Sequence, residues 1–184
     1  MKKFITFPLM ALIMFVSCSE KEDFNKSEDL VFSFNGNNLT IDGGDKISYE
    51  EFSSHIINQG WKNVSQDVIL RDGSIKKNVW FDGKPVPYYF FDSTEITDLQ
   101  FALHSFQYLY EEHGTLFKCP REKDESFFMK ILQIKNDSFY CVEKLGYNGK
   151  DPLYALIKYQ KMSKEEIDKY RSYWAEHDGV NEYE

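Results

Sequence analysis

The sequence has fewer basic than acidic residues, and this imbalance excludes one class of protein. Its 22 lysines and arginines are outnumbered by 30 aspartates and glutamates, which gives a formal charge of −8. Proteins that bind nucleic acid neutralise its phosphates with a basic surface. We therefore expect no nucleic-acid partner for this acidic chain.

The sequence also lacks the common motifs of enzymes and metal sites. It contains no glycine-rich phosphate loop, no paired-cysteine zinc motif, no HExxH and no nucleophile elbow. The histidines are scattered, and the one candidate fragment of a metal site is His113 in the segment "EEHGT", beside Glu111 and Glu112. A solvated turn explains this segment better than a metal site does. We expect neither enzymatic activity nor a cofactor or metal.

The stretch from Ile41 to Phe52, "IDGGDKISYEEF", resembles the second half of a calcium-binding EF-hand loop. Such a loop needs glycine at its sixth position and oxygen ligands at its first, third, fifth, seventh, ninth and twelfth. If Glu51 is the twelfth residue, Asp45 takes the glycine position and Gly44 takes a ligand position. The alternation in the preceding "LVFSFNGNNLTI" predicts a strand, or a hairpin around Asn35-Gly36, rather than an entering helix. The stretch is therefore not expected to bind calcium.

The same stretch has the signature of a helix start. Ser48 followed by Glu51 forms a capping box, and Ile47 and Phe52 are spaced as a hydrophobic staple. Gly60 is placed to end this helix.

A second helix is predicted near the C-terminus in "MSKEEIDKYRSYWAEHDG". Ser163 and Glu166 form its capping box, Met162 and Ile167 form its staple, and Gly179 lies beyond its end. Both helices are interpreted as structural elements.

A single apolar run, Phe4 to Val16, follows Lys2 and Lys3 near the start of the chain. It is shorter than the ~20 residues that cross a bilayer, and its form is typical of an export signal. It ends at "FVSC", which resembles the lipobox of bacterial lipoproteins. The resemblance implies that residues 1–17 are a signal peptide and that Cys18 is acylated after cleavage. An ordinary secretory signal cut nearby is the alternative.

Residues 18–29 are expected to be a flexible acidic tether, because "SEKEDFNKSED" offers almost no apolar surface to bury. Its start, Lys21-Glu22-Asp23, resembles the export signal of Gram-negative lipoproteins displayed on the cell surface. The resemblance implies lipid anchoring to the outer membrane through Cys18, with surface display. A plain soluble linker is the alternative.

The remaining chain is expected to form one domain, residues 30–179, followed by a short tail, residues 180–184. Between Trp61 and Lys161 the sequence has short runs of β-forming residues separated by turn signals, such as Arg71-Asp72-Gly73. The runs number eight or nine, and their connections are too short for crossover helices, which predicts an antiparallel meander. Such a meander closes most simply into an up-and-down barrel, with a two-sheet sandwich as the alternative.

Two cysteines other than Cys18 are present, Cys119 and Cys141. An exported protein meets an oxidising compartment, where a disulfide forms if the geometry permits it. In a meander, Cys119 ends one strand and Cys141 lies early in the second strand after it, so the two cysteines lie at opposite ends of strands that are not neighbours. A disulfide needs Cα atoms within about 7 Å, so we expect both thiols to be reduced and buried.

This layout resembles the lipocalin-like, or calycin, lipoproteins of Gram-negative bacteria. The resemblance is carried by Gly60-Trp61 at the first strand, "RDGS" at the first hairpin and "IKYQKMS" at the last strand. It implies a mostly β fold, an antiparallel barrel of about eight strands with a short N-terminal helix and a C-terminal helix.

Barrels of eight strands either hold one small ligand or are filled by their own side chains. In the first case we expect a small apolar ligand to bind to aromatic residues, among them Tyr88, Phe90, Phe106 and Tyr108. In the second case the chain is a structural or interaction module that docks an envelope protein. A cavity would favour the first function, and a closed core with an exposed apolar patch would favour the second.

Overall fold

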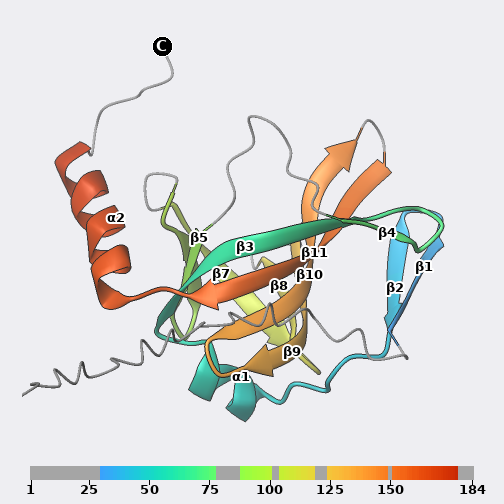
Figure 1. Ribbon diagram of the computed structural model, residues 1–184, viewed down its shortest axis with the longest axis horizontal. Coiled ribbons are helices and arrows are strands. Elements are labelled where there is room, and N and C mark those ends of the chain that lie inside the picture. The colour runs from blue at the N-terminus through green and yellow to red at the C-terminus, as the bar shows by residue number, and fades with distance from the viewer. Residues whose placement is uncertain (1–29, 78–87, 101–103, 119–123, 149–150, 178–184) are drawn as a thin grey trace, which may run out of the picture.

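The computed structural model describes residues 30–77, 88–100, 104–118, 124–148 and 151–177 (Figure 1). The expected signal peptide, the tether with Cys18, and Cys119 lie outside the described residues. So do Gly179 and the tail.

Eight strands of the described chain form a closed antiparallel barrel (Figure 1). Neighbours around the barrel are, in order, β3 (Gln59–Ile69), β5 (Tyr88–Phe91), β6 (Glu95–Asp98), β7 (His104–Glu111), β8 (Thr115–Lys118), β9 (Asp124–Lys135), β10 (Ser138–Asn148) and β11 (Asp151–Lys161). The barrel closes where β11 pairs with β3, from Tyr154 opposite Ile69 to Lys161 opposite Trp61. Closure of the sheet on itself confirms the barrel and shows that the sandwich alternative is wrong.

Turn residues explain the hairpins. Gly73 adopts a positive φ of 81° between β3 and the short β4 (Ile75–Lys76), and Gly36 adopts one of 61° between β1 (Val31–Asn35) and β2 (Asn38–Asp42). Glycine enters this region without steric penalty. The two hairpins predicted at these glycines are confirmed.

The first predicted helix is α1 (Tyr49–His55), which packs against one end of the barrel. The Ser48 hydroxyl accepts a 3.1 Å hydrogen bond from the backbone N–H of Glu51, as the predicted N-cap requires. Ile47 and Phe52 are fully buried in the same cluster as the side chains of the barrel interior. This contact holds α1 at the end of the barrel where β3 begins.

The predicted role of Gly60 as the end of α1 is wrong. The helix ends at His55, and Asn58 rather than Gly60 takes the left-handed conformation, with φ 60°. Gly60 lies within β3, opposite Phe90 of β5. Strand pairing begins immediately after Asn58, so the chain turns from helix to strand before it reaches the glycine.

The second predicted helix is α2 (Lys164–His177), which lies on the outside of the barrel. The Ser163 hydroxyl accepts from the N–H of Glu166 at 3.2 Å, and the Glu166 carboxylate accepts from the N–H of Ser163 at 2.8 Å. Both halves of the capping box are therefore formed. Met162 and Ile167 are buried with Leu99 in a separate cluster beneath the helix.

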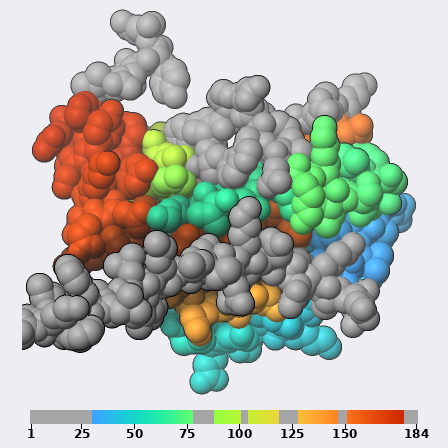
Figure 2. All heavy atoms as spheres, viewed as in Figure 1, coloured from blue at the N-terminus to red at the C-terminus, as the bar shows by residue number. Residues whose placement is uncertain are grey.

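The β1–β2 hairpin covers another part of the outer barrel surface, away from α2 (Figure 2). Buried side chains join the two layers: Leu30, Phe32, Ile69, Leu132, Val142 and Leu156. Arg71 fastens the hairpin tip, because its guanidinium donates to Gly36 O at 2.8 Å and lies over the Phe34 ring. The barrel thus packs an apolar layer on its outer face as well as in its interior.

Candidate functional site

The barrel interior is the candidate site, and strand alternation decides which side chains enter it. In β11, Ala155, Ile157 and Tyr159 belong to the interior cluster, whereas Tyr154 and Leu156 pack with the β1–β2 hairpin outside. Successive side chains of a strand point to opposite faces of the sheet, which explains this division of β11.

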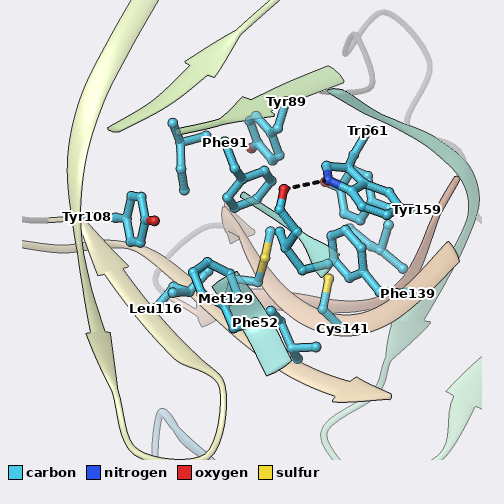
Figure 3. Packing of buried hydrophobic residues seen from close by; sticks show 14 of the residues in the cluster. Phe52, Trp61, Tyr89, Phe91, Tyr108, Leu116, Met129, Phe139, Cys141 and Tyr159 are labelled. Atoms are coloured by element: carbon cyan, nitrogen blue, oxygen red, sulfur yellow. Dashed lines mark hydrogen bonds between the residues drawn. The ribbon is translucent and has the colours of Figure 1, made fainter. Parts of the chain in front are cut away.

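Large aromatic side chains fill the part of the interior next to α1 (Figure 3). Five of them are fully buried: Phe52, Trp61, Phe91, Phe139 and Tyr159. The Trp61 indole donates a 3.2 Å hydrogen bond to Ile56 O, so its polar atom is satisfied inside the core. Phe139 stacks on Tyr159 with ring centroids 5.0 Å apart. This part of the barrel is a packed core.

The structure places two of the four predicted ligand-binding residues inside the barrel. Tyr108 is buried in the interior cluster, and Phe106 packs against that cluster with Lys118 over its ring. The Tyr108 hydroxyl donates to Asp92 O at 2.8 Å.

The other two predicted residues, Tyr88 and Phe90, lie on the outer face of β5 beneath α2. The ring of Tyr88 meets that of Tyr170 edge to face at 5.6 Å, and Arg171 lies 4.4 Å above the ring of Phe90. The four residues therefore do not form one site.

A buried carboxyl group lies among the aromatic residues of the interior. Glu143 of β10 is 3% exposed. Its Oε1 accepts from the Tyr89 hydroxyl at 2.9 Å, and its Oε2 accepts from the Tyr159 hydroxyl at 2.8 Å. Tyr89 comes from β5, which pairs with neither β10 nor β11. These hydrogen bonds therefore join strands across the barrel as well as around it.

Burial changes the proton affinity of each member of this group. It raises the pKa of Glu143 to about 7, although the two tyrosine hydroxyls, by stabilising the carboxylate, oppose the shift. Nearby Asp98 adds a smaller upward push. Burial, reinforced by the Glu143 charge, raises the pKa of Tyr89 and of Tyr159 well above the usual value. Near neutral pH, the Glu143 carboxyl group therefore changes its protonation state, while both tyrosine hydroxyl groups stay protonated.

Two amide side chains of β3 also belong to the interior by strand register. Gln66 is opposite Ile157, and Asn63 is opposite Tyr159. Residues directly opposite each other in antiparallel strands share a face of the sheet. Both amides are buried, and Asn63 Nδ2 donates a long, 3.4 Å hydrogen bond to Gln66 Oε1. Asn63 Oδ1 has no hydrogen-bond partner.

We call Asn63, Gln66, Tyr89, Glu143 and Tyr159 the inner polar group. Sequence reasoning missed Glu143, yet a signal was present. In "SFYCVEKL", Glu143 has the same parity as Phe139 and Cys141, both of which enter the core. A carboxylate in register with two core residues predicts a buried charge.

The remaining candidates do not form a site. His113 lies in the β7–β8 turn, more than half exposed, with its Nε2 3.9 Å from Glu112 Oε2. Within the part of the chain that the structure describes, no three His, Cys, Asp or Glu residues are grouped so that they could hold a metal ion. Among the same residues, no helix has the length and apolar character needed to span a membrane. Cys141 is a free thiol buried in the interior cluster.

No family model, curated protein or solved structure matches this chain. The eight-stranded antiparallel barrel is consistent with the lipocalin-like fold that the sequence resembles.

Proposed function

We propose that this chain is a lipid-anchored protein of the bacterial cell envelope whose barrel binds a small, largely apolar molecule. The observation that supports binding is the hydrogen-bonded carboxyl group of Glu143 inside a largely apolar interior. Small-molecule sites typically combine apolar walls with a few placed polar groups.

A buried carboxyl group such as that of Glu143 is not expected in a core that contributes stability alone. Burial of a carboxyl group carries a desolvation penalty, and well-packed apolar residues of similar volume often replace buried charges without loss of stability. Ionisable groups with strongly shifted pKa values also concentrate at functional sites. Glu143 meets both descriptions, since it is 3% exposed and its pKa is raised to about 7.

The anchor part of the proposal is supported by the sequence of the N-terminal region. Lys2 and Lys3, the apolar run to Val16 and the "FVSC" segment have the order of a lipoprotein signal. Acyl chains on Cys18 would hold the barrel at the outer membrane, and the acidic tether that follows supports display on the cell surface.

One observation favours the alternative function, a non-catalytic module with a filled barrel that docks an envelope protein. The five fully buried aromatic side chains beside α1 leave that part of the interior packed. In this case Glu143 would only tie β5 to β10 and β11.

Native mass spectrometry of the full-length protein separates the two functions. The protein is extracted with mild detergent from the envelopes of cells that produce it at its ordinary level. A small molecule that leaves on gentle activation supports the binding function and gives the mass of its ligand. A bare protein mass, together with a co-purifying envelope protein, supports the alternative.

Membrane attachment is tested separately with Cys18→Ala. We expect the wild-type chain to sediment with outer membranes and the variant to be released, because the variant lacks the acylated thiol. Cys119→Ser is the matched control and is expected to stay with the membrane. Sedimentation of Cys18→Ala with the membrane would contradict the anchor.

A further inference from the structure

The inner polar group has hydrogen-bond acceptors that its own donors leave unused. Its two hydroxyl donors, from Tyr89 and Tyr159, are both used on Glu143. An ionised carboxylate has about four lone-pair positions, so two tyrosines leave it able to accept further hydrogen bonds. Asn63 Oδ1 is a second acceptor, and it has no partner.

Strand register shows how these acceptors are arranged on the barrel wall. Asn63, Tyr159 and Phe139 form one row across β3, β11 and β10. Along these strands, the next row of inward-facing residues holds Gln66, Ile157 and Cys141. The row after it holds Val68, Ala155 and Glu143. The two acceptors therefore lie two rows apart on the same wall, with the Tyr159 side chain reaching from the first row to the third.

The surroundings of Glu143 are apolar and include a small residue. Its direct cross-strand neighbours are Ala155 and Met129. Val68 lies beyond Ala155 in the same row. Asp98, which is opposite Tyr89 on β6, adds a second carboxylate to this region. An anionic group entering here would be repelled by the negative charges of Glu143 and Asp98, whereas a donor group would find acceptors.

We propose that the inner polar group receives the hydrogen-bond-donating end of the ligand, an ammonium or a hydroxyl group, and rejects a carboxylate in the same position. This inference rests on the proposed binding function and narrows its ligand class to apolar molecules with a donor end. The Glu143 carboxylate is the main acceptor for the ammonium, and Asn63 Oδ1 is an additional acceptor for a hydroxyl.

The test compares three probes that share one apolar chain and differ only in the end group: hexylamine, 1-hexanol and hexanoate. Each is titrated calorimetrically into the full-length protein in detergent micelles, with the heat of titration into empty micelles subtracted. We expect hexylamine and 1-hexanol to bind, and hexanoate to bind at least about tenfold more weakly, the factor that corresponds to loss of one charge-assisted hydrogen bond.

Two substitutions identify the acceptors. Glu143→Gln is expected to weaken hexylamine binding about tenfold while it changes 1-hexanol binding less, because it removes the charge and keeps the shape. Asn63→Leu is expected to weaken 1-hexanol binding. It exchanges an amide, whose Oδ1 is unpaired and whose Nδ2 makes one long hydrogen bond, for an apolar group of similar size and is therefore expected to fold.

Each variant has a matched control outside the barrel interior. Glu112→Gln removes an exposed carboxylate in the β7–β8 turn. Gln133→Leu removes an amide whose Oε1 is also buried without a partner but which lies opposite Tyr140 on the outer face. Neither control is expected to change the affinity of any of the three probes. Circular dichroism and thermal unfolding establish that each variant is folded before it is titrated.

The outcomes separate this inference from the function on which it rests. Hexanoate binding as tightly as hexylamine, or a hexylamine affinity unchanged by Glu143→Gln, would overturn the donor-end inference and leave barrel binding intact. Absence of binding by all three probes would also overturn it. If the native mass spectrum then shows a bare protein as well, the binding function fails too.

Discussion

Gly60 of β3 lies directly beneath Ile167 of α2: a Cβ atom on Gly60 would stand 2.7 Å from Ile167 Cγ1 and 2.9 Å from its Cδ1. Both distances are shorter than real Cβ atoms tolerate. The absence of a side chain at this position is therefore what allows α2 to lie close against the barrel.

Gly60→Ala is expected to destabilise the protein by about 1–3 kcal/mol, as overpacking does elsewhere. The measurement is urea unfolding followed by tryptophan fluorescence, since the Trp174 indole donates to Leu99 O only when α2 is docked. Ile167→Ala opens space for the new methyl group, so the double variant should lose less stability than the two single losses combined. Additive losses would show that the two positions do not touch.

The Ser163 hydroxyl is the cap of α2, and Ser163→Ala is expected to cost about 1 kcal/mol of unfolding free energy. Ser172→Ala, at an exposed position of the same helix, is the matched control, because alanine is a good helix former there. Thermal unfolding of both variants checks the prediction. Equal midpoints for the two would contradict the cap.

Glu143 should make the protein less stable as the pH rises. The pKa of its carboxyl is about 7 in the folded state against a usual value of 4.5, so the folded protein holds this proton more tightly. The stability that this group contributes is complete below about pH 4.5 and is lost as the pH rises through about 7. A shift of this size corresponds to roughly 3 kcal/mol.

The measurement compares urea unfolding of the wild type and Glu143→Gln between pH 4 and pH 9. The difference between the two proteins isolates this group from the other carboxylates. We expect the variant to gain stability relative to the wild type as the pH rises, and Glu112→Gln to show no such gain. A constant difference across this range would mean that the carboxyl titrates alike in both states.

Cys141 should be unreactive while the protein is folded. Its side chain is fully buried, and burial raises the pKa of its thiol well above the usual value, so little thiolate is present. In the Cys18→Ala, Cys119→Ser variant, Cys141 is the one cysteine of the three that remains. Iodoacetamide is expected to label it only after denaturation, as read by mass spectrometry. Rapid labelling of the folded variant would show that the interior is open to solvent.

Sequence patterns predicted the features of the fold that depend on local chemistry. Capping residues such as Ser48 and Ser163, and turn glycines such as Gly36 and Gly73, act on the few residues around them. Their structural roles therefore follow from short segments. The prediction for Gly60 was wrong because the requirement for glycine at this position comes from Ile167, more than one hundred positions away.

The candidate site was less predictable, for two physical reasons. In "YYFF" all four residues are aromatic, so alternation cannot distinguish the inward Tyr89 and Phe91 from the outward Tyr88 and Phe90. Glu143 had the parity of a core residue, but its partners Tyr89 and Tyr159 come from strands distant in sequence. Pairing of that kind appears only when the barrel is assembled.

The barrel closes only when β11, its last strand, pairs with β3, its first. Trp61 of β3 lies early in the sequence, but it can pair with Lys161 of β11 only after the intervening strands have formed. Until then, β3 and β10 each present a row of unpaired backbone groups, which are templates for pairing with another chain. Contacts of such long range also slow folding. A chain truncated before Asp151 would thus keep an open sheet with two unpaired edge strands, and it would be prone to self-association.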